Sequence, residues 1–508
     1  MAENTARSTA IRNVLIVGGG TAGWMTAAAL SNVFSKTQCR IRLIESDHIG
    51  TVGVGEATIP VVLKFNQMLG IDEDDFLRST QGTFKLGIQF VNWGSLGNHY
   101  IHPFGSYGTP MGNLSFYHYW LKYHRQGKSK DIGEFSIAVQ AALNGKFMRP
   151  ANMPNSPLAQ IAYAYHFDAG LYAKYLRNFS EQKGVERIEG EIIDVAIRPD
   201  DGFIESVTLK DGEKYNADLY IDCTGFRGLL IERALNTGFI DWSHYLPCDR
   251  AVTVPSSNIG PPDSYTRSTA HTAGWQWRIP LQHRTGNGHV YSSKYMSDEQ
   301  AREILLNHTE GKALADPRII HFRTGMRKKF WNKNCVAIGL SSGFLEPLES
   351  TSIHLIQSSI AKLLALFPTT DFPQPVIDKY NQILSAEFVG VRDFIILHYK
   401  ATHRTDSAFW NYCRHMDIPE NLQNKIALYQ SSGRLFRDNS ELFDEISLIT
   451  VMHGQGIRAS QYHPMVDDIN DEEFDRLMKE IKSVINRSAQ AMPRHSDFIA
   501  RHCAAQAL

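Results

Sequence analysis

The sequence predicts an α/β fold in which a buried parallel sheet is followed by a mainly helical C-terminal part. Residues 12–17, Arg-Asn-Val-Leu-Ile-Val, form a run that ends in three glycines, a pattern typical of a strand buried on both faces of a parallel sheet. Similar runs reach a glycine at residues 217–225 and 335–340. Near the end of the chain, apolar residues recur with helical spacing from Phe474 to Ile485.

A glycine loop follows the first predicted strand with the spacing Gly-x-Gly-x-x-Gly, and a helix is predicted directly after it over residues 21–34. In this arrangement the first glycine makes the tight turn, the second lets the backbone approach a pyrophosphate, and the third packs the helix against the strand. The pyrophosphate then lies at the positive N-terminus of the helix. The residues expected to surround it are Gly18, Gly20, Thr21, Ala22 and Gly23.

A second predicted strand over residues 40–44 ends at Glu45. This is the place along the chain where dinucleotide-binding proteins carry the acid that accepts hydrogen bonds from the adenosine ribose. The loop alone fits either NAD or FAD. FAD is favoured because apolar runs that end in glycine recur as far as Leu340, whereas a domain that binds NAD alone would finish near roughly residue 150.

The composition excludes several classes of partner and site. The net charge is −1 and both signs are mixed along the chain, so neither nucleic acid nor a membrane is an expected partner. The six cysteines show no C-x-x-C spacing, which indicates reduced thiols and no metal site. Residues 1–10 are polar, and no run of about 18 apolar residues occurs. We expect a soluble, cytoplasmic protein folded as a single unit over residues 1–508.

Three further segments carry patterns that a dinucleotide site does not require. Residues 275–280 read Trp-Gln-Trp-Arg-Ile-Pro, residues 344–350 read Phe-Leu-Glu-Pro-Leu-Glu-Ser, and residues 83–90 place Lys85 among apolar neighbours. Taken alone, two tryptophans two positions apart on a strand point the same way and can simply fill a core. A lysine among apolar residues is costly to bury without a partner, and often extends its ammonium group into water instead.

Together these segments resemble the flavin-dependent halogenases, which share the W-x-W-x-I-P and F-x-x-P-x-x-S signatures. The resemblance runs along nearly the whole chain and includes residues 53–58, 100–104 and 223–228. It is closest to the tryptophan and indole halogenases, because the phenol and pyrrole halogenases lack Glu349 at that place.

The resemblance implies an FAD-binding, flavoprotein monooxygenase-like body over residues 1–100 and 155–370, with a mainly helical substrate-binding part over residues 101–154 and 371–508. It also implies a possible homodimer, and a separate flavin reductase as the source of FADH2. Two alternatives are an FAD-dependent aromatic hydroxylase and a flavin-binding protein without chemistry. The W-x-W-x-I-P box argues against the first, and the presence of both Lys85 and Glu349 argues against the second.

The same resemblance assigns roles around the flavin. Reduced FAD and O2 oxidise bromide or chloride to hypohalous acid, with the halide held by the backbone N–H groups of Thr351 and Ser352. Family members usually carry Gly where this chain has Ser352, which leaves the halide preference open. The remaining residues of this region are Leu340 and Ile353, which bind the cofactor, and Trp275 and Trp277, which shield it from the organic substrate.

Hypohalous acid then reaches Lys85, which hydrogen-bonds it or forms a haloamine and presents the halogen to one ring carbon. Glu349 polarises the electrophile and accepts the ring proton as a general base, and Ser350 is the orienting hydroxyl. Glu346 is the rival acid. A carboxylate and a lysine that share a dry site also shift each other's pKa.

The substrate site is expected at His102 and Phe104, which match the aromatic residues that sandwich the indole in tryptophan halogenases. The C-terminal lid of those enzymes brings a Trp, two tyrosines and an acid to the amino-acid substrate. This chain has no Trp after Trp410, and the corresponding residues 441–456 show no such set. We therefore expect indole, an indole derivative or a larger indole-bearing molecule in preference to free tryptophan, and bromination at least as good as chlorination.

Overall fold

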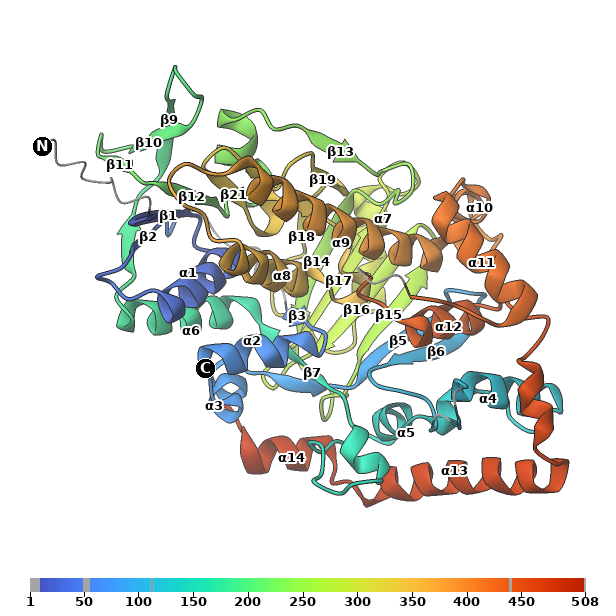
Figure 1. Cartoon of the computed structure of the whole chain (residues 1–508). Helices are drawn as coiled ribbons and strands as arrows, with labels where there is room; N and C mark the ends of the chain where they lie inside the picture. The colour runs from blue at the N-terminus through green and yellow to red at the C-terminus, as the bar shows by residue number, and fades with distance from the viewer. Residues whose placement is uncertain (1–9, 49–54, 110, 113, 438–440, 507–508) are drawn as a thin grey trace, which may run out of the picture.

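The computed structural model describes residues 10–48, 55–109, 111–112, 114–437 and 441–506. An α/β body carries most of the chain, and the helices from residue 408 onward, in orange to red, lie along the right-hand and lower sides of the view (Figure 1). Gly53 and Val54, which begin one of the segments that resemble the halogenases, lie outside the described residues.

A six-stranded sheet forms the dinucleotide-binding part of the body. Its central strand is fully buried at Val14, Leu15 and Ile16 and pairs in parallel with a neighbour on each side, as the apolar run predicts. The strand order is β20 (Trp331–Asn332), β21 (Cys335–Ala337), β12 (Leu219–Asp222), β1 (Asn13–Val17), β2 (Arg40–Glu45) and β8 (Glu186–Glu189).

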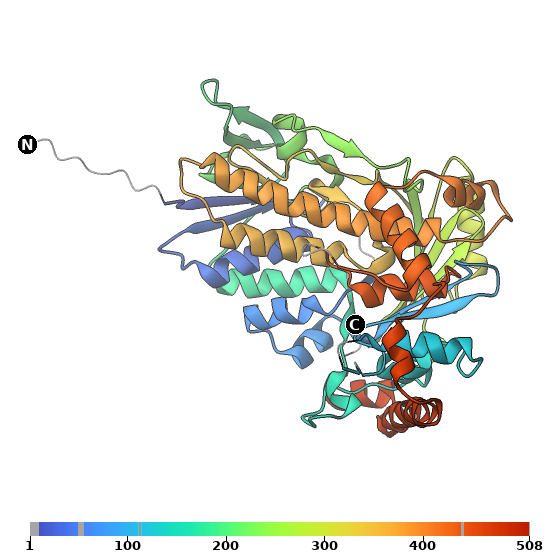
Figure 2. The same ribbon diagram turned by 45° about the vertical axis from the view of Figure 1, so that its right-hand side comes forward.

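Helices of the body pack around this sheet. The predicted helix after the glycine loop is α1, which contacts both α6 and α8. In Figure 2 the brown helix α8 runs beside the long orange helix α9, and the two helices are in contact. The body helices are α1 (Thr21–Val33), α2 (Val61–Leu69), α3 (Glu73–Ser79), α6 (Ala169–Gln182), α7 (Asp298–Asn307) and α8 (Ser352–Ala365).

A seven-stranded, mostly antiparallel sheet forms the second half of the body and carries the two tryptophans of the W-x-W-x-I-P box on β16. The predicted boundary after residue 100 falls within β6, so the first residues of the predicted helical part belong to this sheet. The strand order is β18 (Arg318–His321), β14 (Arg250–Ser256), β17 (Thr285–Tyr291), β16 (Gly274–Pro280), β15 (Thr266–His271), β5 (Gly87–Val91) and β6 (His99–Pro103).

Three small sheets complete the described strands. One of them carries Lys85 at the end of β4, where it pairs with Ala164 of β7. Its strands are β3 (Gly55–Ala57), β7 (Ala164–Asp168) and β4 (Thr83–Lys85). The others are β11 (Lys214–Asn216) with β10 (Ile204–Leu209) and β9 (Ile192–Ile197), and β13 (Phe239–Asp241) with β19 (Gly325–Arg327) and β22 (Gly343–Phe344).

The described residues from 371 onward contain helices and no paired strand. The longest helix, α9, brings buried side chains such as Phe394 and His398 toward the body, and α13 packs on α4 and α5. The helices after residue 371 are α9 (Gln374–Lys400), α10 (Ala408–His415), α11 (Glu420–Ser432), α12 (Glu445–Gly454), α13 (Asp471–Ala491) and α14 (His495–His502), whereas α4 (Phe116–Arg125) and α5 (Ile137–Leu143) belong to the earlier segment.

Candidate active site

The glycine loop opens into a cavity of about 420 Å³ at the N-terminus of α1. Gly18 has a φ of 107°, and a Cβ there would lie 2.3 Å from the carbonyl oxygen of Cys223. A Cβ on Gly23 would lie 1.9 Å from the Gly18 carbonyl oxygen, so only glycine allows this close packing of α1 on the loop. Several residues predicted to bind the cofactor line the cavity: Gly18, Gly20, Thr21, Ala22, Glu45, Leu340 and Ile353.

The carboxylate of Glu45 is fixed beside the loop by partners that the sequence did not indicate. Arg187 of β8 donates to Oε1 at 2.5 Å, and the indole N–H of Trp24 lies 3.3 Å from Oε2. A Cβ on Gly19 would overlap this carboxylate at 1.5 Å from Oε2. The protein's own side chains therefore fix the orientation of the acid at the end of β2.

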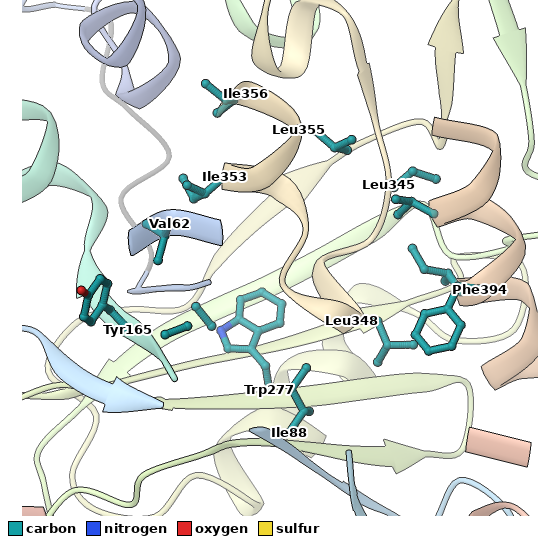
Figure 3. Packing of buried hydrophobic residues seen from close by; sticks show 14 of the residues in the cluster. Val62, Ile88, Tyr165, Trp277, Leu345, Leu348, Ile353, Leu355, Ile356 and Phe394 are labelled. Carbon is teal, nitrogen blue, oxygen red and sulfur yellow. The ribbon is translucent and has the colours of Figure 1, made fainter. Parts of the chain in front are cut away.

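The two tryptophans of β16 form part of the cavity wall. Their rings lie 6.0 Å apart between centroids, on the same face of the strand. The N–H of Trp275 donates to Glu346 Oε2 at 2.9 Å, whereas the buried Nε1 of Trp277 has no hydrogen-bond partner among the described residues. Trp277 lies with Leu348 and Ile353 in the packed apolar layer around the cavity (Figure 3).

Lys85 is fully buried and held by two oxygens. Its Nζ donates to the carbonyl oxygen of Thr58 at 2.9 Å and to Oγ of Ser350 at 2.7 Å, and it lies 5.1 Å from the ring centre of Phe104. Burial lowers the pKa of Lys85 to about 7, against the opposing charge of Glu349. Ser350 also lines the cavity, so it joins the lysine to the dinucleotide site.

Glu349 is buried between two histidines. His102 Nδ1 lies 3.0 and 3.1 Å from its two oxygens, and His398 Nε2 lies 2.8 Å from Oε1. Burial alone would raise the pKa of Glu349, but the charges and hydrogen bonds of the two histidines lower it to about 2. Nδ1 of His398 contacts the carbonyl oxygen of Phe394 at 2.8 Å, which leaves Nε2 as the nitrogen that can exchange a proton with Glu349.

Glu346 contacts a different set of groups. Its Oε2 accepts hydrogen bonds from Trp275 at 2.9 Å and from the hydroxyl of Tyr399 at 2.5 Å. Burial raises the pKa of Glu346 to about 7, partly offset by these two hydrogen bonds. The two candidate acids thus lie in separate environments, and Glu349 is the one whose charge acts on Lys85.

The turn between the two acids and α8 contains the predicted halide site. Ser350 adopts the left-handed conformation with a φ of 59°, Thr351 is the N-cap, and α8 begins at Ser352. The first amides of a helix have no carbonyl acceptor within the helix and point outward at its positive end. Ser352 also lines the cavity, so the first residue of α8 lies at the edge of the dinucleotide site.

Comparison with known proteins decides the family. The profile described as tryptophan halogenase matches residues 13–471. The chain belongs to the tryptophan halogenase family. It is 34% identical to a 7-chloro-L-tryptophan 6-halogenase of Kutzneria, over 96% of this chain and 99% of that protein. It is 37% identical to a tryptophan 6-halogenase of Streptomyces toxytricini, over 81% of this chain and 83% of that protein.

The fold of this tryptophan halogenase family member also matches solved structures. A flavin-dependent halogenase from Xanthomonas campestris has a TM-score of 0.95 and 47% identity, covering 98% of this chain and all of that one. Another from Brevundimonas has a TM-score of 0.94 and 46% identity, covering 97% and 99%. The prediction of a flavin-dependent halogenase with an α/β flavoprotein body is confirmed, and the hydroxylase and the flavin-binding protein without chemistry are not favoured.

Some residues of the halogenase site were missed in the sequence. His398 and Phe394 are one helical turn apart on α9, a spacing that puts both on one face. The ring of Phe394 stacks on Phe443 at 3.9 Å between centroids and lies 5.8 Å from His102. A histidine on the apolar face of a long helix was the available signal, but a buried structural histidine gives the same pattern.

Three further features of the described residues concern metal ions, thiols and membranes. They contain no group of three or more His, Cys, Asp or Glu side chains that could bind a metal ion. All six cysteines are buried and free. No described helix is both long enough and apolar enough to cross a membrane.

Proposed function

We propose that this halogenase uses FADH2, O2 and a halide ion to halogenate an electron-rich, indole-type compound beside Lys85 and Glu349. The observation that carries the proposal is the position of Ser350, which lines the dinucleotide cavity and accepts a hydrogen bond from Lys85. The cavity where hypohalous acid would arise and the lysine that would receive it therefore meet at one residue.

The cavity residues fit FAD. Gly18 and Gly19 leave no room for side chains, which lets the backbone approach a pyrophosphate at the open end of α1. The buried N–H of Trp277 on the cavity wall has no hydrogen-bond partner among the described residues, so it can donate to a polar group of the ligand. When bound, the reduced flavin supplies with O2 the oxidising power that converts a halide ion to hypohalous acid.

We propose that the backbone N–H groups of Thr351, the N-cap of α8, and of Ser352, its first residue, hold the halide ion. Backbone N–H groups at a helix N-terminus attract an anion without adding a competing cation. The side chain of Ser352 stands at the cavity edge where family members usually carry Gly. The extra hydroxyl changes the shape of this edge and is compatible with either bromide or chloride.

The halogen transfer that we propose uses three side chains. Lys85 binds hypohalous acid and presents the halogen to a ring carbon, while Ser350 fixes the direction of the lysine. The carbon–halogen bond forms as the oxygen–halogen bond breaks, and the hydroxide that leaves takes a proton from the Lys85 ammonium group and becomes water. The ring proton then passes to Glu349, so hypohalous acid and the ring C–H give a ring C–halogen bond and one water molecule. His398 Nε2, 2.8 Å from Glu349, is placed to take over that proton.

The proposed substrate site is aromatic rather than ionic. His102, Phe104, Phe394 and Phe443 surround the Lys85 and Glu349 groups, and they suit a flat, electron-rich ring. A zwitterion would need paired charges that the sequence of residues 441–456 does not offer in the family's pattern. Indole or an indole-bearing molecule is therefore the proposed substrate in preference to free tryptophan.

Mass spectrometry tests the reaction. Indole is incubated with the protein, FAD, NADH, a separate flavin reductase and bromide. A product with the two-isotope pattern of one bromine is expected. A product that gains one oxygen instead would indicate a hydroxylase, and unchanged indole with steady formation of hydrogen peroxide would contradict the proposed function.

Competition between equimolar indole and tryptophan tests the substrate. We expect indole to react faster, mainly at C3, because an open pocket leaves the choice of carbon to the ring's own reactivity. Bromination should be at least as fast as chlorination in the same assay. Exclusive halotryptophan with one benzo-ring isomer would show that a zwitterion site exists in this chain.

The proposal includes two partners. A separate flavin reductase supplies FADH2, and the chain is proposed to form a homodimer. Omission of the reductase should stop turnover with NADH, while chemically reduced FAD should restore it. Analytical ultracentrifugation of the full chain gives the mass of the assembly, and a monomer at micromolar concentration would remove the dimer from the proposal.

A further inference from the structure

Within the described residues, the two tryptophans on the cavity wall differ in whether a side chain accepts a hydrogen bond from the indole N–H. Trp275 donates its indole N–H to Glu346 Oε2 at 2.9 Å, and the hydroxyl of Tyr399 donates to the same oxygen at 2.5 Å. All three side chains are almost fully buried. Trp277, two residues further along the strand, has no such partner among the described residues.

Aromatic rings and thiols, not cations, surround this carboxyl group. Trp93 packs against Trp275 at 6.3 Å and against Tyr399 at 5.5 Å between ring centroids. Cys248 Sγ lies 3.5 Å from the Tyr399 hydroxyl. The pKa of Glu346 responds to burial and to the hydrogen bonds from Trp275 and Tyr399, with no cation among its causes. Its Oε1 is buried without a hydrogen-bond partner within the described residues. Burying such an acid is costly, and the hydrogen bonds from Trp275 and Tyr399 are the contacts that offset this cost.

We infer that Glu346 is a positioning residue that locks the Trp275 ring into the cavity wall, so that hypohalous acid is directed to Lys85 and kept from the groups behind the wall. The inference rests on the proposed function. Glu346 is the N-cap of the 3-10 turn Pro347–Glu349. The residue that contacts Trp275 and the proposed base Glu349 are therefore the two ends of one short turn. One rigid turn thereby fixes the wall and the base together.

Two substitutions of the acid separate positioning from proton transfer. Glu346→Gln keeps an oxygen that accepts from Trp275 and Tyr399 but cannot exchange a proton, whereas Glu346→Leu removes both hydrogen bonds at similar volume. The readout is the coupling ratio, the halogenated product formed per reduced flavin consumed. We expect Glu346→Gln to stay within about twofold of the wild type and Glu346→Leu to lose about tenfold, as the loss of a hydrogen bond to a charged or strongly polar acceptor predicts.

Hypohalous acid that no longer reaches the substrate should leave the site or oxidise nearby groups. In Glu346→Leu we expect more free hypohalous acid, measured by a soluble trap such as monochlorodimedone, and oxidation of Cys248, measured by peptide mass spectrometry. Oxidation of the thiol consumes one hypohalous acid and yields a sulfenic acid and hydrogen halide. A Glu346→Gln variant as poorly coupled as Glu346→Leu would overturn the inference, because it would show that the proton, not the hydrogen bond, matters.

A double-mutant cycle tests the specific contact and does not depend on the stability of Glu346→Leu. Trp275→Phe keeps an aromatic ring and removes only the N–H donor and part of the bulk, so it should lower coupling on its own. Adding Glu346→Leu to Trp275→Phe should change coupling little further, whereas fully additive losses would contradict the inference. Tyr399→Phe is the matched control, since it removes one donor and leaves the bond from Trp275 in place.

The outcomes distinguish the inference from the function on which it rests. If the wild type forms no halogenated product, the proposed function is wrong. If the wild type halogenates indole and Glu346→Leu or Trp275→Phe does so with unchanged coupling, the inference alone is wrong. Thermal unfolding of each variant with bound FAD confirms that the coupling ratios are measured on folded protein.

Discussion

The dinucleotide cavity and the Lys85–Glu349 site meet at Ser350 but are built in different ways. The glycine loop contributes backbone: Gly18 and Gly23 matter because a Cβ would collide with backbone oxygens at 2.3 and 1.9 Å. The lysine site contributes side chains, and each of its polar groups has a partner from another part of the chain, as in the 2.7 Å bond from Lys85 to Ser350.

This difference predicts how each region tolerates change. At the glycine loop the shape of the backbone decides, so substitutions there should alter flavin affinity. In the lysine site, burial makes every unpaired polar group costly, so substitutions should alter the chemical step. A glycine-loop variant that slows the chemical step, or a lysine-site variant that weakens flavin binding, would contradict this comparison.

The largest expected effect belongs to Lys85→Met. A methionine fills the same buried space without an amine, so halogenation of indole should be lost while FAD binding and hydrogen peroxide formation continue. Flavin fluorescence titration and a peroxide assay provide the controls. More than about a tenth of wild-type halogenation would remove Lys85 from the mechanism, since a required group typically contributes 10²-fold or more.

Glu349→Gln should lower the rate of halogenation by on the order of 10² to 10⁴ at unchanged flavin affinity, because the amide keeps the shape and loses the base. The measurement is single-turnover product formation with excess reduced flavin. Glu346→Gln is the matched comparison on the same turn. A greater loss in the chemical step for Glu346→Gln would show that the two acids have been assigned the wrong way round.

The two regions also differ in how well the sequence predicted them. The strand, glycine loop and helix are consecutive in the chain, so β1 and α1 were predicted to within about one residue at either end. The partners of Glu349 come from β6 and α9, almost three hundred residues apart, and no local pattern pairs His102 with His398. Lys85 and Glu349 were proposed from the family resemblance, and the sequence alone did not bring them together.

A smaller effect is expected for Gly18→Ala, which tests the cavity side of the comparison. The added methyl group meets the Cys223 carbonyl and sits on a residue with a φ of 107°. Such strain costs about 1–3 kcal/mol, so the Kd for FAD should rise by about tenfold to a hundredfold. With saturating reduced flavin, the halogenation rate should return to near the wild-type value. A rate that stays low at saturation would mean that the loop also shapes the lysine site.

The smallest expected effect is a pH dependence that identifies the working form of Lys85. Burial lowers the pKa of Lys85 to about 7, below its ordinary value, so the neutral amine grows from about a tenth to about nine tenths between pH 6 and pH 8. A haloamine forms only from the neutral amine, and single-turnover halogenation should then rise about tenfold over this range. A lysine that merely donates a hydrogen bond needs the ammonium form, and the same rate should then fall as the pH rises. Formation of hydrogen peroxide by Lys85→Met gives the background, because it carries the pH dependence of flavin oxidation without the lysine. A halogenation profile parallel to that background would show that the protonation of Lys85 does not control the step. It would also contradict the view that paired side chains determine the chemistry of the lysine site, whereas backbone shape determines binding in the cavity.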